Sequence, residues 1–347
     1  MKAEVKNYHG TPVVFLDGKP SFFGCHLMGY MSQEDLRITT PVIKEYAKAG
    51  IHIYSIDATP TEWCGPRPGH ASPYDFSTVE PRLNSVIQAD PDALFLFRMQ
   101  FETYSLPGNW WNQAYPDELE VLSDGKKIAQ SFASTIWRNQ VNDFLRAYVD
   151  FLHSVGLYER VIAYQLGTGV TSEWVKSWSS MELPCGDYSQ PMRLHFRAWL
   201  NNKYQNDVSR FQSAWNDTQV TFETAEVPTA DEQLKTRHLS LRDPRLEQKT
   251  VDFYECYAEL CADDLLDFCH TVKEATHNEK LTGAFFGYAM ELAWNDDFFA
   301  PYGQAENRDI SAIQRSGHLG LKKVLHSPKI DFFVSPYSYA FRGLGGD

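Results

Sequence analysis

Short apolar runs alternate with longer amphipathic stretches along most of this chain. Residues 51–57 and 93–99 have the length and composition of buried strands, whereas residues 131–155 repeat apolar side chains at helical spacing. Strands that alternate with helices predict βαβ units and a parallel sheet, which closes into a barrel or forms a doubly wound sheet. No glycine-rich nucleotide fingerprint follows the first strand, so the dinucleotide-binding fold has no support.

The same patterns assign the other elements. A turn at Asp17-Gly18 predicts a hairpin near the N-terminus. Residues 220–245 are polar and are expected to be an irregular insertion over the barrel mouth. Helices are expected at residues 41–49, after Thr78, and at 131–155, 191–216, 247–275 and 310–326. Six barrel strands are expected at residues 22–28, 51–57, 93–99, 161–167, 281–288 and 330–336.

The predicted fold class is therefore α/β, a (β/α)₈ TIM barrel with about six of its eight strands present. We expect residues 1–347 to be one barrel domain with a small N-terminal hairpin. An open six-stranded sheet leaves edges that proteins normally cover. We therefore expect this sequence to be a fragment, with strands 7 and 8 beyond residue 347.

Residues 161–174 join a buried strand to a loop that ends in a carboxylate and an indole. The apolar run breaks at Gly167 and Gly169, and Glu173 and Trp174 follow. Parallel β/α barrels keep their chemistry just past the carboxyl ends of their strands. Glu173 is therefore a candidate general acid/base. The alternative is a solvated loop glutamate that caps the next helix.

Charge and cysteine usage exclude several classes of partner. The net charge of −13 disfavours nucleic acid and anionic membranes. No apolar run has transmembrane length, and the N-terminus lacks the apolar region of a signal peptide. The six cysteines form no Cys-x-x-Cys pair, and no His cluster has zinc spacing. We expect reduced thiols, a cytoplasmic location, and neither a metal nor a cofactor.

Several motifs occur in a characteristic order. They are Tyr-Asp-Phe-Ser at 74–77, Leu-Pro-Gly-Asn-Trp-Trp-Asn at 106–112, the aromatic helices at 196–204 and 211–215, and Asp-Phe-Phe-Val-Ser-Pro-Tyr-Ser-Tyr at 331–339. This order resembles the clan of retaining glycoside hydrolases built on (β/α)₈ barrels, and is similar to the β-galactosidase-like glycoside hydrolase family 42 and its relatives. One departure is Ser172, because the clan usually presents Asn before the acid/base glutamate.

The resemblance implies a glycosidase that acts on a β-linked glycoside, such as a β-galactoside, by a retaining double displacement. It implies Glu173 as the general acid/base and a nucleophilic glutamate at the end of strand 7. By our strand count that glutamate lies beyond residue 347. The isolated 1–347 chain is therefore expected to be inactive.

Three other carboxylates are alternatives for the second catalytic group. Glu291 follows the fifth strand, and its alternative reading is a loop glutamate at a helix start. Asp57 ends the second strand and is expected to bind an arginine or a sugar hydroxyl. Asp331 starts the sixth strand, which is the wrong end of a barrel for catalysis.

Aromatic residues make up 14% of the chain and supply flat faces on which sugar rings can stack. Trp174 and Trp111 are candidates for an apolar wall beside the acid, which would raise its pKa by desolvation. The other candidates for substrate binding, each of which could equally be a core residue, are His26, Asp57, Arg98, Tyr288 and Tyr337.

Two competing functions remain open from the sequence. One is a non-catalytic barrel that binds carbohydrate and has lost a carboxylate. The other is a metal-dependent sugar isomerase or lyase on the same fold, whose ligands would be scattered over several strands. The fold alone cannot choose between these functions. A homo-oligomer is compatible with each of them.

Overall fold

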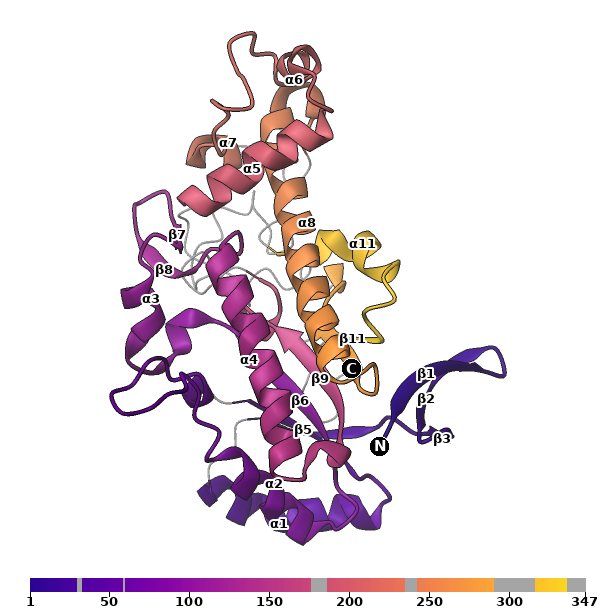
Figure 1. Cartoon of the computed structure of the whole chain (residues 1–347). Coiled ribbons are helices and arrows are strands. Elements are labelled where there is room, and N and C mark those ends of the chain that lie inside the picture. Colours follow the sequence, from indigo (N-terminus) through magenta and orange to yellow (C-terminus); the bar gives the residue numbers. More distant parts are fainter. Residues whose placement is uncertain (30–32, 59, 176–185, 235–241, 290–315, 336–347) are drawn as a thin grey trace, which may run out of the picture.

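The structure is a computed structural model of the 347-residue chain. It describes all residues except 30–32, 59, 176–185, 235–241, 290–315 and 336–347. A parallel sheet carries helices along one side, and a small antiparallel sheet lies near the N-terminus (Figure 1). Within these described ranges, no helix is both long enough and apolar enough to cross a membrane.

Six parallel strands form the central sheet, in the order β11-β10-β9-β6-β5-β4. Each new barrel strand is added at the same side of the previous one, as in a β/α barrel, whereas a doubly wound sheet reverses direction. The prediction of an α/β barrel-type fold with six strands is confirmed. The strands are β4 (Cys25–Gly29), β5 (Ile53–Asp57), β6 (Leu94–Gln100), β9 (Val161–Gly167), β10 (Leu281–Phe285) and β11 (Phe332–Val334).

An antiparallel sheet precedes the barrel strands. It contains β1 (Ala3–Tyr8), β2 (Thr11–Leu16) and β3 (Lys19–Ser21). The predicted hairpin at Asp17-Gly18 is confirmed, and both turn residues have positive φ, as a type I′ turn requires. Strand β1 was not predicted, and the first barrel strand begins at Cys25 and not at the predicted residue 22. Apolar side chains of β1 and β2 pack on inward-facing residues of the barrel strands, namely Ile53, Leu96, Ile162 and Leu281.

The longer helices begin where a side chain can cap their first turn. The Oγ of Ser134 accepts from the N–H of Trp137 at 3.1 Å, and the Oδ1 of Asp243 accepts from the N–H of Arg245 at 3.0 Å. The helices are α1 (Gln33–Lys48), α2 (Val79–Ala89), α3 (Trp110–Ala114), α4 (Thr135–Ser154), α5 (Gln190–Lys203), α6 (Val208–Trp215), α7 (Ala230–Leu234), α8 (Pro244–Ala275) and α11 (Leu321–Leu325). Single 3₁₀ turns are η1 (Pro60–Glu62), η2 (Thr103–Ser105), η3 (Pro107–Asn109), η4 (Tyr158–Arg160), η5 (Val170–Ser172) and η8 (His318–Gly320).

One predicted helix boundary was wrong, and another lies partly outside the described residues. Helix α1 begins at Gln33, so Pro41 lies inside the helix and does not start it. The helix expected at 310–326 is represented by η8 and α11 from residue 318 onward, and residues 310–315 lie outside the described part of the chain.

Strand β6 shows how the two sides of the sheet differ. Phe95, Phe97 and Met99 belong to the main core under the helices, whereas Leu96 belongs to the inner cluster. Successive side chains of a strand point to opposite faces, so Arg98 lies on the same inner face as Leu96. The inner face is therefore apolar near the start of the strands and polar near their carboxyl ends.

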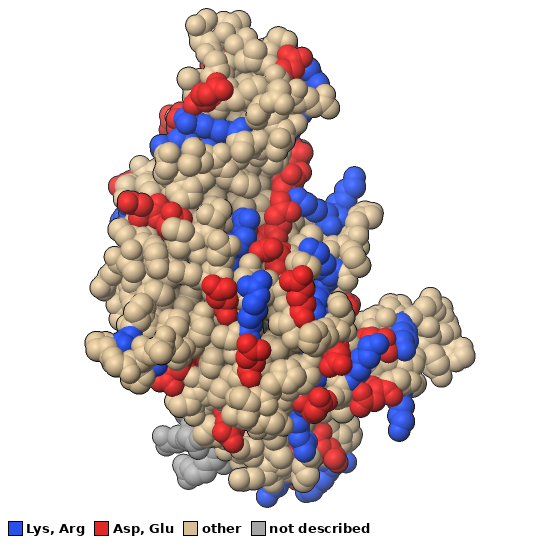
Figure 2. Space-filling view, in the orientation of Figure 1, with Lys and Arg blue, Asp and Glu red and all other residues tan. Residues whose placement is uncertain are grey.

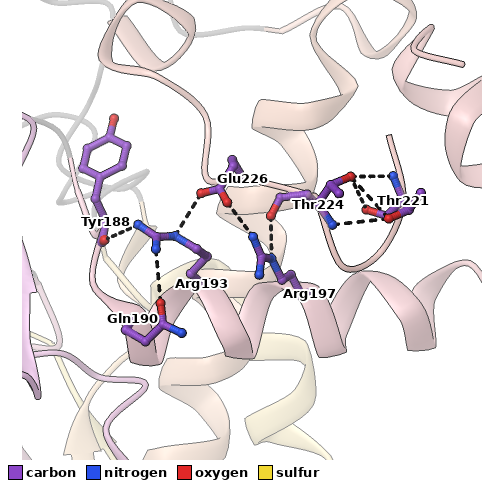
Figure 3. A network of polar contacts seen from close by, with 8 residues as sticks. Tyr188, Gln190, Arg193, Arg197, Thr221, Thr224 and Glu226 are labelled. Carbon is purple, nitrogen blue, oxygen red and sulfur yellow. Dashed lines mark hydrogen bonds and ion pairs between the residues drawn. The ribbon is translucent and has the colours of Figure 1, made fainter. Parts of the chain in front are cut away.

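Helices α5, α6 and α7 pack around the first half of α8 (Figure 1). Glu226, in the extended segment before α7, pairs with Arg193 and Arg197 of α5 (Figure 3). Acidic and basic side chains lie close together along α8 (Figure 2), consistent with ion pairs such as Lys323–Asp263. The predicted irregular region 220–245 thus includes the short helix α7, and its residues 235–241 are not described.

A hairpin that was not predicted lies between β6 and β9 in the chain. It consists of β7 (Leu119–Val121) and β8 (Lys127–Gln130). Its last residue, Gln130, is buried and accepts the N–H of Thr103 on its side-chain oxygen at 2.9 Å. The hairpin is thereby fixed to the chain that leaves the carboxyl end of β6.

Candidate active site

The carboxyl end of β5 carries a buried ion pair. The Arg98 Nη1 lies 3.3 Å from the Asp57 Oδ1, and the Gln100 Nε2 donates to Asp57 Oδ2 at 3.3 Å. Burial raises the pKa of Asp57, and the positive charges of Arg98 and Arg82 oppose this. The guanidinium of Arg98 also lies 5.4 Å from the ring centre of Phe285. Of the two partners expected for Asp57, the structure shows the arginine, as an ion pair, and the role of Asp57 in substrate binding stays a prediction.

The loop after β9 folds tightly back on itself. A Cβ at Gly167 would lie 2.1 Å from the carbonyl oxygen of Ser172, and one at Gly169 would lie 1.8 Å from that of Val175. Because real side chains cannot approach a backbone so closely, both positions need glycine. The two glycines allow the loop to turn within a few residues and to place Glu173 beside the strand end.

We expect Gly167→Ala to displace this loop. The added methyl group would collide with the Ser172 carbonyl, which is backbone and cannot rotate away. Displacement by about 1 Å can cost about 100-fold in rate, so kcat should fall strongly while the far end of the barrel is unaffected. Gly156→Ala is the control, because a Cβ there meets nothing within 4 Å and its only cost is the positive φ of 72°, which Gly167 does not share. Equal kinetic effects of the two substitutions would contradict this account.

Glu173 lies inside the protein, with 4% of its surface exposed. Its Oε2 accepts a hydrogen bond of 2.6 Å from the hydroxyl of Tyr288, which follows β10. The alternative of a solvated loop glutamate is therefore wrong. Tyr288 was predicted at the mouth, and the structure brings it into direct contact with Glu173.

His318 holds the same region from a third segment. Its Nδ1 accepts from the N–H of Gly287 at 3.0 Å, so its Nε2 carries the proton and donates to the carbonyl oxygen of Glu173 at 2.6 Å. Burial lowers the pKa of His318 to about 4, so the ring is neutral at physiological pH. His318 was missed because no sequence pattern links residue 318 to residue 173.

Glu102 is a second buried carboxyl group at this end of the sheet, two residues past the end of β6. Its Oε2 accepts from the N–H of Gly169 at 2.7 Å and from the side-chain amide of Gln130 at 3.2 Å. Burial raises the pKa of Glu102 to about 7. The sequence signal, a glutamate just beyond a predicted strand, was present but was not used.

Both tryptophans that were expected to wall the acid and to bind substrate, Trp174 and Trp111, lie in the core. Trp174 is fully buried and packs against Phe132, Phe268 and Phe286, and its Nε1 donates to the Leu166 carbonyl at 3.1 Å. Trp111 is also fully buried. The expectation that these two indoles line a sugar site is corrected, because neither ring is accessible.

His26 is also placed differently from the prediction. It is the second residue of β4 rather than the last, and its ring stacks on Tyr46 of α1 at 4.2 Å. Burial lowers its pKa. His26 therefore faces the helices and is not brought to Glu173.

Two candidates, Glu291 and Tyr337, lie outside the described residues. Asp331 precedes β11 and accepts from the N–H of Thr282 at 2.8 Å, which places it at the amino end of the strands as predicted. In the part of the chain that is described, one group has the spacing of metal ligands: His52, Asp90 and Asp92. His52 precedes β5 and Asp92 precedes β6, so this group is at the opposite end of the strands from Glu173.

A parallel sheet built by successive β/α units, with buried polar groups at its carboxyl edge, defines a β/α-barrel protein. No protein-family model matches the chain, and no curated protein matches it.

Solved structures do show similarity. The catalytic domain of β-amylase from Paenibacillus polymyxa aligns with a TM-score of 0.60 at 13% identity, over 76% of this chain and 66% of that chain. The β-galactosidase from Bacillus circulans sp. alkalophilus aligns with a TM-score of 0.54 at 14% identity, over 75% of this chain and 36% of that chain. A cold-adapted β-galactosidase from Rahnella sp. R3 aligns with a TM-score of 0.50 at 15% identity, over 74% of this chain and 34% of that chain. These likenesses establish the fold, and the chain spans about a third of each β-galactosidase.

Proposed function

We propose that this chain belongs to a glycoside hydrolase and that Glu173 is its general acid/base. The observation that carries the proposal is the position of Glu173. Its buried carboxyl group lies past the carboxyl end of the fourth barrel strand and is held by the Tyr288 hydroxyl at 2.6 Å. Chemistry in β/α barrels is located at this end of the strands. The glycosidase structures that share the fold support the same class of reaction.

In this proposal Glu173 first donates a proton to the glycosidic oxygen while a second carboxylate attacks the anomeric carbon and the leaving alcohol departs. Glu173 then removes a proton from water, which displaces the second carboxylate and releases the sugar. The hydrogen bond from the Tyr288 hydroxyl to Oε2 fixes the orientation of the Glu173 carboxyl group. His318 fixes the backbone of Glu173 and so limits movement of the acid.

The second carboxylate of this mechanism is Glu291 or the strand-7 glutamate that the resemblance implies. Asp57 is a poor alternative because it is committed to Arg98 and Gln100. The proposed substrate is a β-linked glycoside such as a β-galactoside. With Trp174 and Trp111 buried, hydroxyl groups of the sugar would be bound by polar groups at the strand ends, of which Arg98 and Gln100 are the described candidates.

The stereochemistry of the product tests the mechanism. The protein as its host produces it is mixed with a panel of aryl β-glycosides that includes a β-galactoside, and the first sugar released is followed by proton NMR. We expect the β-anomer to appear first, because double displacement retains configuration. Initial release of the α-anomer would exclude the retaining mechanism. Binding of these glycosides without hydrolysis would favour the non-catalytic barrel.

A further inference from the structure

The loop that carries Glu173 is tied to the end of β6 by one side chain. The Oε2 of Glu102 accepts from the N–H of Gly169 at 2.7 Å and from the hydroxyl of Thr168 at 3.3 Å. The same oxygen accepts from the amide of Gln130 at 3.2 Å. Glu102 is 7% exposed. A single carboxylate thus joins three segments of chain at the site.

The residues that Glu102 binds form the base of the loop. The N–H of Trp174 donates to the carbonyl oxygen of Thr168 at 2.9 Å, so the residue after Glu173 is fastened to the residue next to Gly169. Between these points, Thr171 and Ser172 have φ of 53° and 65°, which is unfavourable for residues other than glycine. Such a backbone persists only when its surroundings hold it.

We infer that Glu102 is a positioning residue, whose carboxylate holds residues 168–174 in the conformation that presents Glu173 to the substrate. This inference deepens the proposed function and rests on it. Glu102 does not have to touch the sugar, because it acts through the hydrogen bonds to Thr168 and Gly169. Its loss should therefore lower kcat more than it changes KM.

The protonation state of Glu102 provides a second signature. Burial raises its pKa from 4.5 to about 7, the charge of Glu120 raises it further, and the hydrogen bonds from Gln130, Gly169 and Thr168 oppose this. Its Oε1 is buried and has no hydrogen-bond partner among the described residues. An ionised carboxylate accepts hydrogen bonds more strongly than a neutral one. The loop should therefore be held more firmly above pH 7 than below it.

Global stability should change in the opposite direction. Between pH 4.5 and 7 the folded chain retains a proton on Glu102 that the unfolded chain has released. The contribution of Glu102 to stability is therefore largest at low pH, falls as the pH rises through this window, and is constant above it. Glu102→Gln removes this component of the pH dependence. It also keeps an acceptor oxygen and a similar shape.

Hydrogen exchange measured by mass spectrometry tests the inference without a substrate. Peptides that cover residues 168–174 are compared between wild type, Glu102→Gln and Glu102→Ala from pH 6 to pH 8, after correction for intrinsic exchange. We expect these peptides to exchange at least about tenfold faster in Glu102→Ala than in wild type. In Glu102→Gln we expect the change in protection near pH 7 to be lost. This second result does not require that Glu102→Ala folds. Asp264→Asn is the control, because Asp264 is a buried carboxyl group on α8 that pairs with Arg138 of α4.

The outcomes separate this inference from the proposed function. Unchanged protection of residues 168–174 in both Glu102 variants, or equal loss of it in Asp264→Asn, would overturn the positioning role whatever the activity. Loss of protection in the Glu102 variants together with a lower kcat supports it. If Glu173→Gln turns over substrate normally while the Glu102 variants loosen the loop, the proposed role of Glu173 fails and the tether itself stands.

Discussion

Replacing Glu173 by glutamine is expected to lower the turnover of a β-linked disaccharide by about 10³-fold in the protein as its host produces it. Glutamine keeps the shape of the side chain and can still accept the hydrogen bond from Tyr288, but it cannot transfer a proton. The loss of turnover should be largest for glycosides with poor leaving groups, because their departure depends most on protonation by the general acid. It should be much smaller in kcat/KM for a dinitrophenyl glycoside, whose leaving group departs without protonation.

The second step of the mechanism provides an independent check on Glu173. In Glu173→Ala, azide can attack the covalent intermediate without a general base, so added azide should increase turnover of the dinitrophenyl glycoside and form a β-glycosyl azide. Glu80→Gln on the exposed side of α2 is the matched control and should behave as wild type. Normal hydrolysis of the disaccharide by Glu173→Gln would show that another group is the acid.

The largest loss of stability is expected from Asp252→Ala. Asp252 is fully buried in α8. Its oxygens accept at 2.7–2.8 Å from four side chains, in α5, directly after α5, in α6 and in α8: Lys203, Tyr204, Trp215 and Gln248. Removing the carboxylate leaves these donors without their common acceptor, and losing one partner of a buried pair costs about 3–5 kcal/mol. Urea unfolding followed by circular dichroism measures this loss.

Two further variants make the Asp252 prediction specific. Asp252→Asn keeps one acceptor oxygen and should cost less than Asp252→Ala. Glu255→Gln removes the other partner of Lys203, but the Glu255 side chain is 49% exposed. An exposed ion pair contributes at most about 1 kcal/mol, so this variant should remain close to wild type. Comparable losses for Glu255→Gln and Asp252→Ala would contradict the role of Asp252 as the centre of this contact.

Strands β5 and β9 could be predicted because they are short and every residue in them is buried. In β9 all seven residues are buried, and the corresponding apolar run stands out in the sequence. Strand β1 was missed because charged residues such as Glu4 and Lys6 interrupt its apolar pattern. The hairpin β7–β8 was missed for a different reason. Its strands have only three and four residues, which is too short to show an alternating pattern.

The candidate site was predictable in part. Glu173 and Asp57 were found because each closely follows or ends a buried strand, and parallel strands end at a common edge. Their roles in catalysis and sugar binding stay predictions. The tryptophans were misjudged because an aromatic residue near a strand end can face either the mouth or the helices. For Trp174 the backbone, with φ of 56°, directs the ring into the core.

The sequence by itself determined the alternation of strands and helices and the loop in which Gly167 and Gly169 precede Glu173. These features depend on local periodicity and on close backbone contacts that few residue types tolerate. Only the tertiary structure decided what surrounds the carboxyl group. Tyr288, His318 and Glu102 are 115, 145 and 71 positions from residue 173 along the chain. Hydrogen bonds between such distant segments exist only once the strands have assembled, because no local pattern encodes them.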